Sequence, residues 1–168
     1  MAKSESKKSA QAQVDDGVQD RDERARSIIR KCAWGSAGIG LLPVPIVDMV
    51  AVGGLQVWLV SELSKIYEVP FSRDRAKALV SALIGAVTPA ALTGTAVSLV
   101  KLVPVVGQLL TIAVAPGLAG ASTLALGRVF NAHFQTGGTL LDFDAEKMAA
   151  YYKDELGKAK EEMAAAKA

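Results

Sequence analysis

The sequence of 168 residues contains a single cysteine, Cys32, and a single histidine, His133. A lone cysteine excludes an internal disulfide framework and a zinc site built from cysteines. A metal site needs three or four ligands, and no cysteine or acidic residue stands at ligand spacing from His133. We therefore expect the histidine to lie at the surface or at an interface, and we expect no bound metal or cofactor.

Motifs for catalysis and nucleotide binding are also missing. The sequence has no Gly-x-Ser-x-Gly motif, and a serine nucleophile would need His133 to reach it across the fold. The stretch "GSAGIG" has no lysine to contact a phosphate, and its spacing does not match a dinucleotide fingerprint. We therefore predict no catalytic residue and a protein that is not an enzyme.

Aromatic residues make up 5% of the chain and the formal net charge is +2. Few rings are available to stack on bases, and the charge is close to neutral, so we expect no nucleic-acid partner. The N-terminal "MAKSESKKSAQAQVDDG" has neither the apolar core of a secretory signal nor the Met-Gly start of a lipidation site. Contact with a membrane is expected through internal segments.

What the chain does have is long apolar stretches. Hydrophobic residues reach 51% and gather in three blocks, Ala33–Val60, Ala78–Val100 and Leu102–Leu126. Each is near the length of about 20 apolar residues that a membrane span needs. Their glycines and alanines favour close helix packing in a bilayer. We predict an all-α fold of apolar, small-residue-rich helical hairpins, membrane-associated and flanked by polar helical tails.

Composition divides the chain into three parts. Residues 1–20 are polar, without an apolar repeat, and are predicted to form a disordered tail. Residues 21–145 form the membrane-associated helical domain. Residues 146–168 form a cytosolic amphipathic helix, with Asp144 as its N-cap and Glu146 in its first turn.

The first block carries Pro43, Pro45 and Asp48 near its middle. Lysines and arginines flank it on both sides, which favours the cytoplasm for both flanks. This predicts a re-entrant hairpin bent at "LPVPIVD", followed by a second hairpin whose far turn holds Lys101 and Pro104. Asp48 either caps the helix that begins there or is an intramembrane carboxylate that handles a proton or ion.

Basic residues flank the apolar blocks at Arg30, Lys31, Arg73, Arg75 and Lys77. Basic side chains near a bilayer attract anionic lipid headgroups, each contributing on the order of 1 kcal/mol. The alternative is a solvated helix face. Both interpretations stay open for these positions.

Several motifs together resemble a known family. They are the P-x-x-D turn at Pro45–Asp48, the linker "YEVPFSRDRAK", the turn "VPVVG" at Val103–Gly107, and "ALGRVFNAHFQTGGT". Over most of residues 33–145 the chain resembles the YcjF-like domain of unknown function. The resemblance implies membrane association and a frequent link to small GTPase-like domains. Because this chain has no P-loop, a GTPase would have to be a separate partner protein.

Three functions compete at this point. The first is a membrane scaffold or adaptor that binds lipids and a GTPase or other cytosolic protein, or that remodels membranes in organelle biogenesis. We expect it, as a monomer or homo-oligomer, at the bacterial inner (cytoplasmic) membrane or an intracellular membrane derived from it, with both termini in the cytoplasm. The second is an oligomeric transport protein with Asp48 facing the path. The third is a soluble helical bundle that binds lipid.

Overall fold

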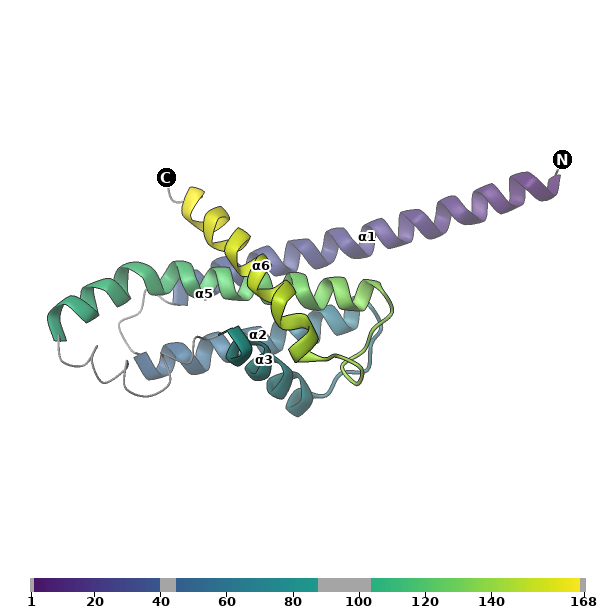
Figure 1. The fold of residues 1–168 in the computed structure, drawn as a ribbon. Coiled ribbons are helices and arrows are strands. Elements are labelled where there is room, and N and C mark those ends of the chain that lie inside the picture. The colour runs from purple at the N-terminus through teal and green to yellow at the C-terminus, as the bar shows by residue number, and fades with distance from the viewer. Residues whose placement is uncertain (1, 40–44, 88–103, 167–168) are drawn as a thin grey trace.

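The computed structural model describes the backbone of residues 2–39, 45–87 and 104–166, and the side chains of residues 15–38, 51–87 and 117–166. The elements are α1 (Ala2–Ile39), α2 (Pro45–Ile66), α3 (Arg73–Val87), α5 (Pro104–Gln135) and α6 (Ala145–Ala165). No strand occurs in the described backbone, and the predicted all-α fold is confirmed (Figure 1).

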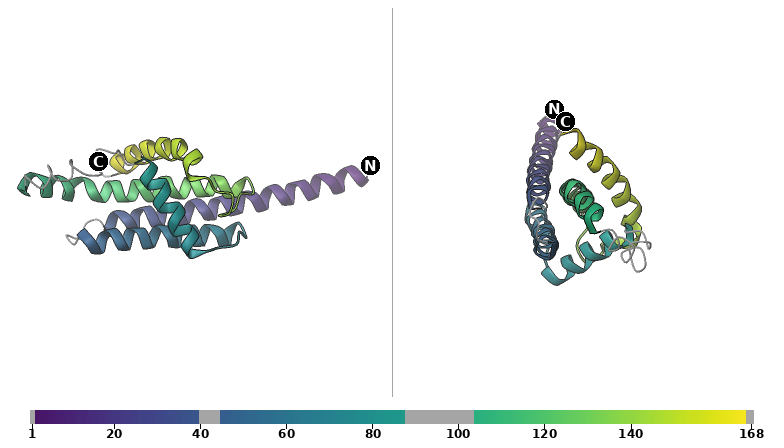
Figure 2. Two further views of the ribbon diagram at one scale, coloured as in Figure 1. Left: turned by 60° about the horizontal axis from the view of Figure 1, so that its bottom comes forward. Right: turned by 90° about the vertical axis from the view of Figure 1, so that its left-hand side faces the viewer.

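Three helices form the body of the molecule. The C-terminal half of α1 lies beside α2 and α5 along one axis, and α3 and α6 cross them (Figure 2). Hydrogen bonds fix the directions: Asp22 and Ser36 of α1 bond Asn131 and Thr123 of α5, so these two helices are antiparallel. Since α2 returns along α1, it runs in the same direction as α5.

The core is built from side chains of all five helices. Its largest members that are completely or almost completely buried are Ile29, Leu59, Leu63, Leu83, Leu126, Phe130 and Tyr152. Gly127 allows α5 to approach its neighbours, because a Cβ there would lie 2.8 Å from Ile29 and 3.1 Å from Leu59. The predicted role of small residues in close helix packing is confirmed at this position.

The first apolar block folds as a helical hairpin. It is divided between the end of α1 and α2, and a Cβ on Gly35 would lie 3.6 Å from the Leu55 side chain across the pair. Pro45 is the first residue of α2, where a proline needs no N–H partner and its fixed φ suits the helix. Pro43 lies outside the described residues.

The second predicted hairpin differs from the structure over residues 78–87. Helix α3 packs against α2 and α6. It buries Ala76, Val80 and Leu83 at helical spacing, while small residues on its other face are exposed. It is therefore amphipathic, which its high content of Ala and Gly concealed. Lys101 lies outside the described residues. Over the described part of the chain, no helix combines the length and hydropathy of a membrane span.

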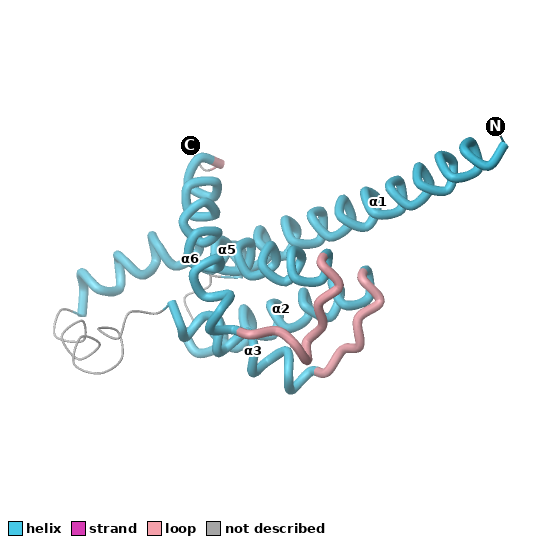
Figure 3. The backbone as a smooth tube through the Cα atoms, turned by 45° about the vertical axis from the view of Figure 1, so that its right-hand side comes forward, coloured by secondary structure: helices cyan, strands magenta, loops and turns pink. Residues whose placement is uncertain are grey.

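The N-terminus also differs from the expectation of disorder, because α1 extends back to Ala2. Residues 15–20 are all exposed, and this half of α1 projects away from the bundle (Figure 3). The composition correctly indicates a segment that buries little. It does not exclude a helix, because the packed half of α1 supplies the nucleus from which a helix extends at low cost.

Helix α6 begins as the sequence predicts. The Asp144 carboxylate accepts hydrogen bonds from the backbone N–H groups of Glu146 and Lys147, at 3.1 and 3.2 Å. The helix packs on α5 and α3 and buries Tyr152, Glu155, Ala159 and Met163. The loop before it contains the "QTGG" that ends α5, with Gly137 in the left-handed region at φ 82°.

Candidate functional site

One end of the bundle, where α1, α2 and α5 lie together, carries little charge. The C-terminal end of α1 and the N-terminal ends of α2 and α5 lie there, on the left in Figure 1. We call residues 35–39, 45–57 and 104–121 the apolar end. Within these ranges Asp48 is the one charged residue in the sequence. The arrangement gathers parts of the first and third apolar blocks on one surface.

Large apolar side chains surround the inner boundary of this end. Trp34 is 49% exposed, Trp58 50% and Leu118 44%. They lie on α1, α2 and α5, each one to three residues from positions where these helices touch, at Gly35–Leu55 and at Gly120. We call the three residues the rim. Contiguous exposed apolar patches mark binding surfaces, and tryptophan is enriched where membranes meet water.

The basic residues predicted to meet lipid fall into two groups. Arg30 and Lys31 are exposed on α1, one turn before Trp34 and on the same side of the helix. Arg73, Arg75 and Lys77 are exposed at the start of α3, beside the loop that follows α2 and away from the apolar end. The structure therefore brings only Arg30 and Lys31 to the rim.

A buried layer of hydroxyl and amide groups lies at the level of the rim. Ser36 Oγ and Thr123 Oγ1 are 2.8 Å apart, and Gln56 Nε2 donates to Thr123 Oγ1 at 3.2 Å and to Ser122 Oγ at 3.4 Å. Ser122 Oγ lies 2.9 Å from the Tyr152 hydroxyl. Burial raises the pKa of Tyr152, so its phenol stays protonated. The layer joins α1, α2, α5 and α6.

The side chains that sequence analysis weighed for chemistry are held in structural contacts. Cys32 is buried, and burial followed by the charge of Glu62 raises the pKa of its thiol, which disfavours the reactive thiolate. His133 Nε2 lies 2.9 Å from the Thr139 carbonyl oxygen. Among the described residues no group of three or more His, Cys, Asp or Glu is placed to hold a metal ion.

The comparison with protein families decides the classification. A model described as "Domain of unknown function (DUF697)" matches residues 5–161. The chain belongs to this family. The matched region includes α6 and most of α1 as well as the central helices, so the DUF697 unit comprises the whole bundle described above.

One relative of this DUF697 chain is "Magnetosome membrane protein 22" of Magnetospirillum gryphiswaldense. The two are 36% identical over 141 residues, which cover 83% of this chain and 72% of the relative. No solved structure matches the chain.

The remaining predicted site residues of the DUF697 chain lie at helix starts. Pro104 is the first residue of α5 and Gly107 follows in its first turn. Asp48 lies in the first turn of α2, three residues after the helix begins. Its side chain is outside the described residues, so its role as a helix-capping group or as an ion-handling carboxylate stays a prediction.

Sequence reasoning did not single out the rim or the buried layer. A signal for the rim was present, because Trp34 and Trp58 are the two tryptophans of the chain and stand near the ends of the first block. Gln56 was a second signal, as an isolated amide in an otherwise apolar stretch. These residues lie at the same height along the bundle only because of how α1, α2 and α5 are aligned, and no local sequence pattern predicts that alignment.

Proposed function

We propose that this chain is a non-enzymatic, membrane-associated scaffold that embeds its apolar end in one leaflet up to the rim and works in the formation of an intracellular membrane compartment. The rim carries the proposal. It exposes about half of Trp34 and of Trp58 at the boundary between an uncharged end and a charged body. A soluble surface gains nothing from such exposure, whereas a water–bilayer interface stabilises it.

Charge next to the rim supports the same orientation. Arg30 and Lys31 lie one turn from Trp34, on the side away from the apolar end. With the rim at the interface, both side chains reach the headgroup layer, where each adds on the order of 1 kcal/mol against an anionic surface. The resulting orientation leaves the N-terminus on the cytoplasmic side, because the N-terminal half of α1 projects from the opposite end.

The relative supports the cellular role. Its name assigns it to the magnetosome membrane, and magnetosomes are intracellular compartments. The chain's own localisation would then be a membrane of this kind, derived from the inner membrane. We further propose that the charged body, including the projecting half of α1, binds a cytosolic protein, with a separate GTPase as the first candidate from the family resemblance.

Tryptophan fluorescence tests the orientation directly, because Trp34 and Trp58 are the two tryptophans of the chain. Single-tryptophan variants Trp34→Phe and Trp58→Phe would be bound to neutral vesicles whose lipids carry bromine at different acyl depths. Both remaining tryptophans are expected to shift to shorter wavelength and to be quenched most strongly by shallow bromines.

The matched control places the reporter at the other end. Leu141 is 74% exposed in the loop between α5 and α6, so Leu141→Trp in a Trp34→Phe/Trp58→Phe background reports on the body. This tryptophan is expected to escape quenching. Equal quenching of the rim reporters and the Leu141→Trp reporter, or no binding to vesicles, would overturn the proposal.

A further inference from the structure

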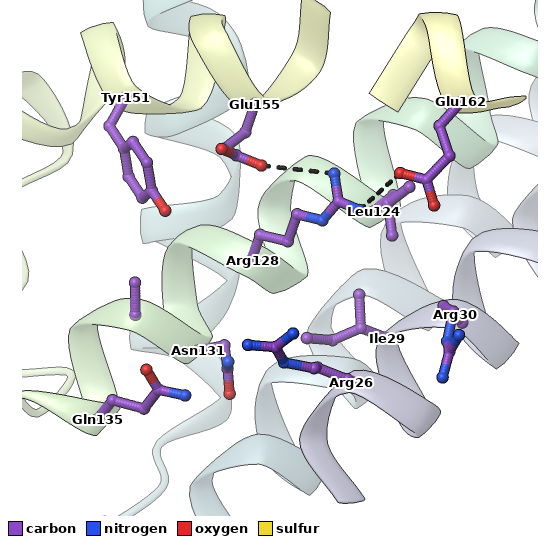
Figure 4. A pocket seen from close by; sticks show the side chains of 11 residues that line it. Arg26, Ile29, Arg30, Leu124, Arg128, Asn131, Gln135, Tyr151, Glu155 and Glu162 are labelled. Carbon is purple, nitrogen blue, oxygen red and sulfur yellow. Dashed lines mark hydrogen bonds and ion pairs between the residues drawn. The ribbon is translucent and has the colours of Figure 1, made fainter. Parts of the chain in front are cut away.

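A groove of about 530 Å³ lies between α1, α5 and α6 (Figure 4). Its volume falls in the range of small-molecule sites. The charged and aromatic side chains that line it are Arg26, Arg30, Arg128, Tyr151, Glu155 and Glu162. We call it the arginine groove. It brings together arginines from α1 and α5, which the sequence separates widely.

Arg128 is held by two carboxylates of α6. Its Nη2 lies 2.6 Å from Glu162 Oε2 and its Nη1 lies 3.5 Å from Glu155 Oε2. Glu155 is buried and has a second partner in Lys158 at 3.0 Å. Glu162 is 49% exposed, and exposed ion pairs contribute little. Arg128 can therefore exchange Glu162 for another anion while Glu155 stays compensated.

The arginines of α1 leave donors available. Arg30 is exposed and has no ion pair or hydrogen bond with any described residue. Arg26 pairs with Asp22 through Nε at 2.8 Å, but its side chain is still 69% exposed. The two side chains are one turn apart on α1, so they face the same side. Arg128 lies on α5 beyond them in Figure 4, with its guanidinium directed at Glu155 and Glu162 of α6.

We infer that the arginine groove binds a phosphate group, with Arg30 and Arg26 as the primary donors and Arg128 joining them by releasing Glu162. Guanidinium groups bind phosphate through paired N–H donors, and three arginines line this groove. Arg30 is one turn from Trp34, so in the proposed orientation the groove opens at headgroup depth. The assignment to a lipid headgroup rests on the proposed function, whereas binding of a soluble phosphate ester does not.

The test compares two charge removals on the same helix. Arg30→Gln removes a groove arginine, and Lys31→Gln removes the same charge from the next residue, which does not line the groove. Binding of the full-length chain would be measured on neutral phosphatidylcholine vesicles and on vesicles containing phosphatidylglycerol. The gain is the increase in affinity for vesicles that contain phosphatidylglycerol over phosphatidylcholine vesicles. Arg30→Gln is expected to abolish most of this gain, and its loss of affinity is expected to be at least fivefold larger than that of Lys31→Gln. Phosphatidylcholine also carries a phosphate, but its choline cation offsets the charge, so both variants are expected to lose much less binding on these vesicles.

Glycerol phosphate distinguishes the source of the phosphate. Competition by free glycerol phosphate, together with a shift of the Arg30 Nε–H signal in NMR spectra, means that soluble phosphates enter the groove. A fivefold loss on phosphatidylglycerol vesicles without competition assigns the groove to lipid headgroups. Equal losses for Arg30→Gln and Lys31→Gln without competition would overturn the inference, while normal binding to neutral vesicles would leave the proposed function intact.

Glu162→Gln gives an independent test, because it frees Arg128 without removing a groove cation. Phosphate binding is expected to become a few-fold tighter in this variant. Glu161→Gln is the matched control, since Glu161 is the exposed neighbour of Glu162 and does not line the groove. A weaker or unchanged affinity in Glu162→Gln would contradict the exchange of partners at Arg128.

Discussion

The two ends of the bundle are closed by different kinds of contact. At the end that holds the loops, large rings pack together: Phe130 stacks on Phe143 at 4.5 Å and contacts Phe134 at 5.9 Å. At the apolar end, α1, α2 and α5 meet through glycine, alanine and hydroxyl groups, and the tryptophans remain at the surface. The first end buries its largest rings, while the second leaves both tryptophans about half exposed.

The two ends therefore differ in how they hold the helices together. The aromatic end holds the loops, and Tyr67 and Asn131 link α2 to α5 there through a 2.8 Å hydrogen bond. The small residues at the other end allow the helices to approach closely while keeping their large side chains outward. Substitutions can therefore change the stability of the bundle without changing the membrane contact that we propose for the rim.

Phe130→Ala is expected to have the largest effect, because it removes the centre of the aromatic cluster. Phe130 is completely buried, and such truncations cost about 3–5 kcal/mol of unfolding free energy. Denaturant unfolding followed by circular dichroism measures the loss. Phe71→Ala is the control, since Phe71 is 39% exposed at the same end. Similar losses in the two variants would contradict the proposed difference between buried and exposed rings.

Gly120→Val tests the close approach at the other end. A Cβ at Gly120 would lie 2.6 Å from Met163 Cε of α6, 3.0 Å from the Ala33 carbonyl oxygen and 3.2 Å from the Ala37 Cβ. The flexible Met163 side chain would therefore have to move, and α5 would be pushed from α1. Overpacking of this kind costs about 1–3 kcal/mol. Gly157→Ala is the control, because nothing lies within 4 Å of the added methyl group and helix propensity improves by about 1 kcal/mol. Destabilisation by Gly157→Ala, or none by Gly120→Val, would refute this account.

Gln56→Leu tests the buried layer. The substitution removes two hydrogen bonds from α2, but Thr123 keeps Ser36 and Ser122 keeps Tyr152. We expect a loss of about 1 kcal/mol in unfolding free energy, measured by denaturant titration. Ser64→Ala, which removes a bond only to the Val60 carbonyl of its own helix, serves as comparison. A gain in stability would show that the layer does not stabilise the bundle.

The smallest effect concerns pH. Hydrogen bonds from the Lys147 backbone and side chain hold the pKa of Asp144 below its usual value. A depressed folded-state pKa stabilises the protein above the unfolded-state value of about 4 and loses that contribution as pH falls. Asp144→Asn still caps but does not titrate, so thermal melts from pH 7 to pH 3 should show less acid destabilisation. Equal curves for Asp144→Asn and the parent chain would contradict the assignment.

Local features of the fold could be predicted from the sequence, and contacts between distant segments could not. The Asp144 cap and the bend near Pro45 each depend on neighbouring residues. The packing of α3 against α6 depends on which buried faces fit together. The rim and the arginine groove also require the alignment of α1 with α5, because Arg26 and Arg128 are far apart in sequence.

Helix α1 connects the exposed N-terminal half with the apolar end without interruption from Ala2 to Ile39. At about 1.5 Å per residue, its 38 residues extend for about 57 Å. It acts as a stiff lever. In the proposed orientation, a protein that binds the projecting arm and tilts it would rotate Trp34 and its neighbours within the membrane interface. Force applied to the arm would then reach the lipid without any helix unfolding.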